Sequence, residues 1–250
     1  NPATGDVGRF QIMEVEYVDA NPVLQEDGSY VITVDSTTDE DNVSTCGFDD
    51  GGGAYSGGGC GGPNGLPNGK TSLREAIGVA NRRGGHDIIH FNIPTTDPNY
   101  IQPNGDTQGY WPITLSPQIS LTDDSGVYIN GYSQPGASRN TASFGEPINT
   151  VLNIRIQSDD WYLNLTGDNN QIAGINFGAY LYSLSDNNWL EGNFFGSNIS
   201  GTQGLTEGVI LMGSNAASNI IGTNGDGVGD VGERNLFATN GTNPYADIDM

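Results

Sequence analysis

A ten-residue pattern that recurs in the second half of the chain limits the fold more than any other feature of the sequence. The segment NNQIAGINFG at 169–178 returns as NNWLEGNFFG at 187–196, so the two copies begin 18 residues apart. Both copies keep the leading pair of Asn, an aliphatic residue at the fourth position, Gly at the sixth and tenth, and Phe at the ninth. A shorter third copy begins at residue 217, and RNLF at 234–237 resembles a degenerate fourth copy.

A unit of this length holds one or two short strands and a polar corner, and it cannot bury its apolar face alone. Stacking successive units buries that face and gives a solenoid of parallel strands. Asn at the corners suits a left-handed backbone conformation, and its side chain can form a ladder of hydrogen bonds between units. We therefore expect stacked coils over residues 86–250, preceded by an N-terminal unit over residues 1–85 that is continuous with them.

The N-terminal unit contains the one helix that the sequence predicts. Apolar runs around residues 10–18 and 30–34 indicate strands, and the Gly-rich stretch that follows them indicates a surface loop. Ser72 and Glu75 then form a capping-box pattern, in which each side chain accepts a hydrogen bond from the backbone amide of the other residue. Apolar residues at helical spacing follow as far as Ala80, so we expect a helix that covers an open end of the sheet stack.

The charge balance narrows the choice of partners. The chain has 30 Asp and Glu residues against 8 Lys and Arg, a formal net charge of −22. A surface of this charge repels phosphate backbones and anionic lipid headgroups, so we expect no nucleic-acid partner, and cations are its natural counter-charge. No window approaches 18 apolar residues, so we also expect no membrane span.

Cys46 and Cys60 are the two cysteines of the chain, and they bracket a Gly-rich stretch with few apolar side chains. In an oxidising compartment a disulfide between them would close a loop of about 15 residues and stabilise the fold by about 3 kcal/mol in the chain-entropy model. The alternative is two unpaired thiols in a flexible loop. We favour the disulfide, because this stretch has little apolar matter of its own to hold it together.

Several motifs resemble those of one known family. VITVDSTTDED at 31–41, the Cys-bearing Gly loop after it, TSLREAI at 71–77, DIIHF at 87–91 and INGYSQPG at 129–136 are similar to the CSLREA domain. In that family the domain is an N-terminal module of bacterial and archaeal secreted or cell-surface β-helix proteins. The resemblance implies an all-β fold, namely a right-handed parallel β-helix with an N-terminal strand–loop–helix cap, and an extracellular or cell-surface location. One position departs from the family pattern, since Thr71 stands where the family has Cys.

The best candidate ligand site lies in the sequence NGDGVGD and the Glu that follows it. Asn224, Asp226, Asp230 and Glu233 offer oxygen ligands, and the intervening Gly residues allow the tight turns that a Ca²⁺ site needs. The alternative is an ordinary acidic turn. A weaker second candidate for Ca²⁺ consists of Asp35, Asp39 and Asp41.

No constellation of catalytic residues stands out in the sequence. Adjacent carboxylates, such as Asp123 and Asp124, point to opposite faces of a strand and do not form an acid–base pair. We therefore expect a non-catalytic, extracellular structural or adhesive module rather than an enzyme, with a glycan or another cell-surface component as its ligand. The alternative is a lyase or hydrolase that acts on a neutral glycan, because a chain of this charge repels acidic polymers.

The segment 245–250 alternates between apolar and polar residues like a further strand. An uncovered coil at the end of a solenoid exposes backbone donors and acceptors to pairing. Two interpretations follow. Either the native protein continues past Met250, or the open end meets another copy of the chain head to tail and builds a filament.

The disulfide can be tested by peptide mapping. Mass spectrometry of unreduced, protease-treated protein should show the peptides of Cys46 and Cys60 linked to each other, and reduction should separate them. Two freely alkylated thiols in protein produced in an oxidising compartment would contradict the prediction.

Overall fold

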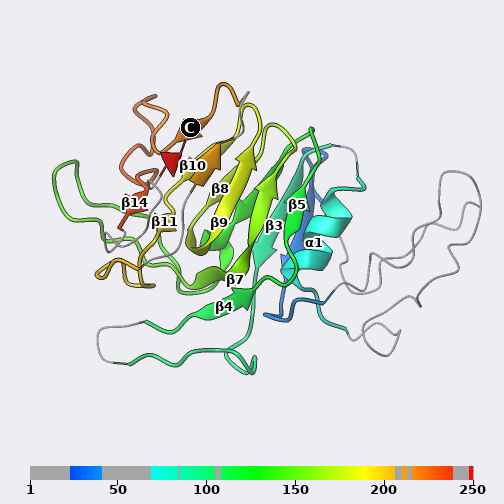
Figure 1. Ribbon diagram of the computed structural model, residues 1–250, viewed down its shortest axis with the longest axis horizontal. Coiled ribbons are helices and arrows are strands. Elements are labelled where there is room, and N and C mark those ends of the chain that lie inside the picture. The colour runs from blue at the N-terminus through cyan, green and yellow to red at the C-terminus, as the bar shows by residue number, and fades with distance from the viewer. Residues whose placement is uncertain are drawn as a thin grey trace, which may run out of the picture.

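The computed structural model describes residues 23–40, 69–83, 85–104, 108–205, 210–212, 216–238 and 248–249. The strands in these residues form two sheets of mainly parallel strands (Figure 1). In the described part of the chain, sheet 1 has seven strands in the order β1-β2-β3-β6-β8-β10-β13. Their bounds are Val23–Leu24, Tyr30–Val34, Asp87–Phe91, Val127–Asn130, Gln171–Ala173, Trp189–Glu191 and Ile220–Ile221.

Sheet 2 is built around two long strands, β7 and β9, which pair with each other in parallel. Both β4 and β5 pair with β7, and both β11 and β12 pair with β9. The sheet continues from β11 to β14 and from β12 to β15. The bounds of β4, β5, β7, β9, β11, β12, β14 and β15 are Trp111–Thr114, Ile119–Leu121, Ile154–Leu165, Ile175–Leu184, Phe194–Phe195, Ile210–Met212, Leu236–Phe237 and Ile248–Asp249.

The prediction of an all-β fold made of a single right-handed parallel β-helix is wrong. The described strands form two sheets, one of them curled into a half-barrel, and helix α1 (Leu73–Ala80) packs beside them in a mixed α/β arrangement. A regular solenoid requires nearly equal units, whereas the residues joined by one ladder of hydrogen bonds lie 43, 18 and 31 positions apart. The 18-residue spacing holds between two units, and long insertions separate the others.

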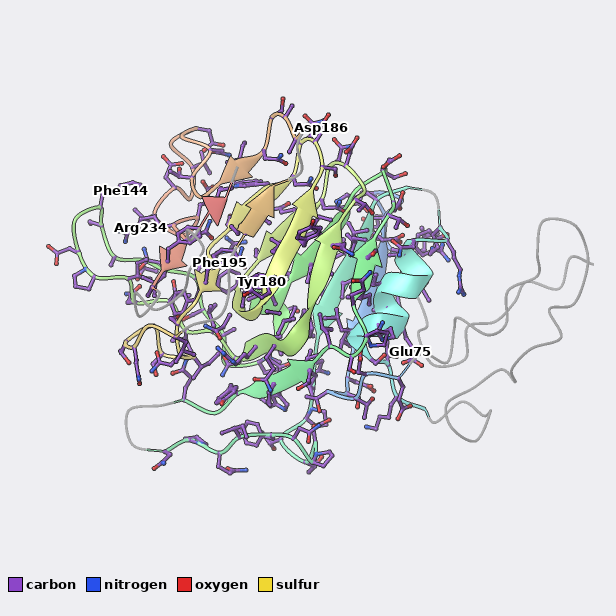
Figure 2. The ribbon with its side chains drawn as sticks, viewed as in Figure 1. Glu75, Phe144, Tyr180, Asp186, Phe195 and Arg234 are labelled. Carbon is purple, nitrogen blue, oxygen red and sulfur yellow. The ribbon has the colours of Figure 1, made fainter. Side chains whose placement is uncertain are left out.

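The stacking of the repeat copies as parallel strands is nevertheless confirmed. Strands β8 and β10 pair in parallel, with Leu190 beside Ile172, and β9 and β11 pair with Phe195 beside Phe177. The third and fourth copies turn out to be the two halves of one further layer, since β13 pairs with β10 while β14 pairs with β11. The ring of Phe195, labelled in Figure 2, stacks between Phe177 and Phe237 with centroid distances of 5.1 Å and 4.9 Å.

Asn side chains join the turns of successive layers, as the repeat predicts. The side-chain carbonyl of Asn170 accepts a hydrogen bond from the backbone amide of Val127 at 2.9 Å. Asn188 accepts in the same way from the amide of Asn170, and Asn219 accepts from the amide of Asn188. A second ladder runs through Asn193, which accepts from Ile175, and Asn235, which accepts from Asn193.

Left-handed backbone positions make these turns tight enough to stack. Asn169 and Asn187, which lead the first two copies of the repeat, have φ angles of 60° and 57°. The Gly that both copies keep at the sixth position is required for a different reason, because a Cβ on Gly174 would lie 2.7 Å from the ring of Tyr132. A Cβ on Gly192 would meet the hydroxyl of the same Tyr, which donates a hydrogen bond to the Gly192 carbonyl at 2.7 Å.

Helix α1 shares the hydrophobic core of the two sheets. Leu73 and Ile77 on its apolar stripe are buried in one cluster with side chains of sheet 1 and of sheet 2. The capping box is present as expected: the Ser72 hydroxyl accepts from the Glu75 amide at 3.1 Å, and the Glu75 carboxylate accepts from the Ser72 amide at 2.8 Å. The helix contacts β2, β3 and β5, so it covers the early strands of both sheets (Figure 1).

The ladders predict a large effect for a buried Asn. The fully buried side chain of Asn193 accepts from the Ile175 amide and donates to the Ile172 carbonyl. Asn193→Ala leaves both backbone groups without a partner, so it should lower the free energy of unfolding by about 2–4 kcal/mol in denaturant titrations. Asn92→Ala, at an exposed position, serves as the control and should change it by less than about 0.5 kcal/mol. Equal effects of the two substitutions would show that the Asn193 hydrogen bonds do not contribute measurably to the free energy of unfolding.

Candidate metal centre

The candidate calcium site lies in the connection between the two sheets. Residues 222–235 lead from β13 of sheet 1 to β14 of sheet 2, within the layer that the third and fourth copies of the repeat form. In the layers that the first two copies of the repeat form, this connection is a single short turn, residue 174 between β8 and β9 and residues 192–193 between β10 and β11. The site is therefore an insertion into a layer whose two ends are held by strand pairing.

The turn is wound tightly around its own polar side chains. Gly225, Gly227 and Gly229 have φ angles of 74°, 84° and 78°, which L-residues with a side chain rarely adopt. The Asn224 side-chain carbonyl accepts from the Asp226 amide at 2.9 Å, and the Asp226 carboxylate accepts from the amide two residues later at 2.7 Å. The alternation of Gly with Asn and Asp is thus what allows the chain to curl back on itself.

Three of the four predicted ligands come together at this turn. Carboxylate oxygens of Asp226, Asp230 and Glu233 all lie within 4.8 Å of one another. Two oxygens that bind one Ca²⁺ at 2.3–2.6 Å lie at most about 5 Å apart, so these three carboxylates are close enough to share an ion. Asn224 lies beside them, since its side-chain amide donates to the Asp226 carboxylate at 3.2 Å.

The three carboxylates differ in how far they are withdrawn from water. Asp226 is exposed, Asp230 is half-buried, and Glu233 is only 5% exposed. One oxygen of Glu233 accepts from the Asn224 amide at 3.0 Å. One oxygen of Asp230, the Oδ1 atom, is buried and has no hydrogen-bond partner among the described residues. A buried carboxylate oxygen without a partner is costly, and a bound cation is one way in which proteins satisfy it.

No described cation neutralises this cluster. The three ion pairs of the described residues join Arg74 to Asp39, Arg83 to Asp87 and Arg139 to Glu191. Arg234, the nearest Arg in sequence, donates instead to backbone carbonyls, including that of Ala142 at 2.7 Å. The arrangement therefore concentrates negative charge at one point, which is the electrostatic requirement for binding a divalent cation.

A distant loop holds the turn in place, and nothing in the local sequence indicates it. The Asn140 side chain donates to the Val231 carbonyl at 2.6 Å, and Arg234 bonds the same loop through Ala142. Figure 2 shows Arg234 beside Phe144 at the tip of that loop, where the guanidinium lies 5.3 Å from the ring centroid. Gly192 of the preceding layer also donates to the Glu233 carbonyl at 2.9 Å.

The second predicted cluster has other partners. Asp39 receives two hydrogen bonds from the Arg74 guanidinium, at 2.7 Å and 2.9 Å, and one from the Ser116 amide. Asp35 accepts from the Thr71 amide at 2.8 Å. Asp41, Cys46 and Cys60 lie outside the described residues, so the disulfide stays a prediction.

Comparison of the chain with family models, with curated proteins and with solved structures finds no match. The resemblance to the CSLREA domain therefore stays a prediction. No helix in the described part of the chain is both long and apolar enough to cross a membrane.

A second group of buried charges lies at the start of β3. The Asp87 carboxyl is 1% exposed, and neither of its oxygens has a hydrogen-bond partner among the described residues. Burial raises the pKa of Asp87 to about 6; Arg83, whose Nε lies 3.7 Å away, acts in the opposite direction, and Asp123 raises the pKa further. The Arg83 guanidinium is itself held over the Tyr30 ring, 3.5 Å from its centroid.

Asp87 predicts a pH dependence of stability that is opposite to the usual effect of carboxylates. Its folded-state pKa of about 6 lies above the ordinary value of 3.8 for an Asp side chain. Folding therefore takes up a proton between these pH values, and stability falls as pH rises through this range. Relative to Asp87→Asn, the wild type should lose up to about 3 kcal/mol of unfolding free energy between pH 4 and pH 7. Chemical denaturation at both pH values tests this, with Glu26→Gln at an exposed position as the control. A constant difference between wild type and variant would contradict it.

Proposed function

We propose that this chain is a non-catalytic structural or adhesive module that works outside the cell, and that Ca²⁺ bound by Asp226, Asp230 and Glu233 locks its 222–235 connection. The convergence of three carboxylates without a described counter-cation carries the calcium part of the proposal. The location of the turn gives the ion a structural purpose, because the connection joins one sheet to the other.

Calcium is favoured over magnesium by the nature of the ligands. Ca²⁺ accepts six to eight oxygens in an adaptable geometry, whereas Mg²⁺ requires a near-ideal octahedron and keeps several waters. The turn offers carboxylates with unequal burial, an Asn amide beside them and backbone carbonyls of a Gly-rich segment. Such an irregular set of oxygens fits the larger and less demanding ion.

The expected affinity of the site for Ca²⁺ and the net charge of the chain support a location outside the cell. Extracellular modules bind Ca²⁺ with Kd values of about 10⁻⁴–10⁻³ M, which suits a surface site of three carboxylates in a calcium-rich medium. A net charge of −22 keeps the protein soluble there and is partly neutralised by the bound cation. The proposed role is thus mechanical: the ion fixes a long connection that the fold alone leaves with mutually repelling charges.

Calcium should stabilise the folded state. At a hundredfold excess over Kd, an ion that binds only the folded state adds about 2.7 kcal/mol to the free energy of unfolding. The melting temperature should therefore rise in Ca²⁺ and fall back to its ion-free value in chelator. Asp226→Asn should abolish most of this shift. In chelator the variant should be at least as stable as the wild type, because one of three repelling charges has gone.

Glu146→Gln provides the matched control. Glu146 is exposed on the loop that contacts Arg234, so its substitution removes one negative charge near the turn without touching the cluster. Calorimetry in Ca²⁺ and in chelator should show the wild-type shift for this control. Identical melting curves for the wild type in both media would exclude the calcium part of the proposal.

A further inference from the structure

We infer that a pocket lined by Asp39, Tyr100 and Gln157 binds a neutral glycan. The pocket has a volume of about 430 Å³ and lies between the segment after β2, the 97–101 loop and the strands β4 and β7 of sheet 2. This volume is within the range of small-ligand sites. The inference rests on the adhesive part of the proposed function, to which it adds a ligand class and a site, and it does not depend on calcium.

An aromatic and apolar surface forms one part of the pocket. The Tyr100 ring lines it and packs on Trp111, with centroids 4.6 Å apart and an interplanar angle of 35°. Ile101, which is 43% exposed, and Pro112 of β4 continue this surface. The apolar C–H faces of a sugar ring pack on such surfaces, while its hydroxyl groups need polar partners at the edge.

Amide and hydroxyl groups supply those partners. Gln157 of β7 donates one side-chain proton to the Thr114 hydroxyl at 3.2 Å, which leaves a second amide proton of Gln157 and the hydroxyl proton of Thr114 for a ligand. Asn99 uses one amide proton on the Thr37 hydroxyl at 3.0 Å and keeps the other. These groups are neutral donors and acceptors placed around an aromatic ring, as recognition of sugar hydroxyls requires.

Two hydrogen-bond networks hold the walls of the pocket. The Asp97 carboxylate accepts a hydrogen bond from the Thr37 hydroxyl at 2.6 Å and another from the backbone amide of Asn99 at 3.0 Å. Asp97 therefore joins the 97–101 loop to the segment after β2. The contacts of Asp39 with Arg74 and Ser116 anchor the same segment to α1 and to the end of β4. The pocket is therefore shaped before a ligand arrives, which lowers the entropy cost of binding.

The charge of the lining selects a neutral ligand. Asp39 is the one ionisable acid or base among the described residues that line the pocket apart from the Tyr100 phenol, and the Arg74 guanidinium neutralises it at 2.7 Å. The described lining contains no Lys, Arg or His that could bind the carboxylate, sulfate or phosphate of an acidic ligand. The net charge of −22 also repels such ligands at long range. Glycoside hydrolysis usually needs a pair of carboxylates, so a lining with one supports binding without cleavage.

Binding should be measured by calorimetry with the full chain. The probes are hexaoses of β-1,4-glucose, β-1,4-xylose, β-1,4-mannose and α-1,4-glucose, with a galacturonate oligomer as the acidic comparison. At least one neutral hexaose should bind, and the acidic oligomer should not. Gln157→Ala and Tyr100→Ala should each weaken binding about tenfold or more, whereas Tyr182→Ala, at an exposed Tyr of β9 outside the pocket, should leave it unchanged.

Melting curves of each variant separate loss of the pocket from loss of the fold, and Gln157→Ala, on a half-buried strand position, is the variant chosen to keep the fold intact. Failure of all neutral hexaoses to bind, preference for the acidic oligomer, or equal affinity of Gln157→Ala and wild type would overturn the inference. Repeating the titration in chelator separates it from the calcium proposal, since binding should persist there. New reducing ends would support glycan binding at the pocket while refuting the non-catalytic function.

Discussion

The structure depends on one recurring interaction, the hydrogen bond from a backbone amide in one layer to an Asn side-chain carbonyl in the next. Each layer of parallel strands must turn a corner, and a turn leaves backbone groups without strand partners. The fully buried Asn188 and Asn193 side chains each accept such a bond inside the molecule at 2.9 Å. Because the Asn is supplied by the neighbouring layer, the same bond fixes the register between layers.

This arrangement tolerates insertions of very different length. Each of these bonds depends only on the two corners that it joins and not on the length of chain between them. That chain is short between Asn170 and Asn188 and extends into longer loops elsewhere. Both candidate sites lie in such added segments. The acidic turn interrupts the last layer between β13 and β14, and the proposed glycan pocket lies beside the loop that follows β3. The paired strands form a rigid frame, and the inserted segments carry the residues that are proposed to bind ligands.

The carboxylates of the two sites differ in their partners. At the acidic turn, the carboxylates of Asp226, Asp230 and Glu233 have no ion-pair partner among the described residues. At the pocket, the Arg74 guanidinium neutralises the carboxylate of Asp39. The same carboxylate accepts a hydrogen bond from the Ser116 amide, and these two contacts hold one wall of the pocket in place. The same side-chain type therefore leaves negative charge without a described ion-pair partner in one place and forms an ion pair in the other. The difference arises from which partner the fold brings within 4 Å.

The sequence by itself determined the local features, because these depend on neighbours within a few residues or on an exact repeat. The capping box of Ser72 and Glu75, the left-handed Asn169 and Asn187, and the 18-residue register all follow from such patterns. So does the grouping of Asp226, Asp230 and Glu233, which one short turn brings together. Tertiary structure alone decided the branching into two sheets, the pairing of Asp39 with Arg74, and the pocket. Asp39 and Arg74 lie 35 positions apart, and the pocket joins residues as distant as Thr37 and Gln157. No periodicity in the sequence encodes contacts across insertions of unequal length.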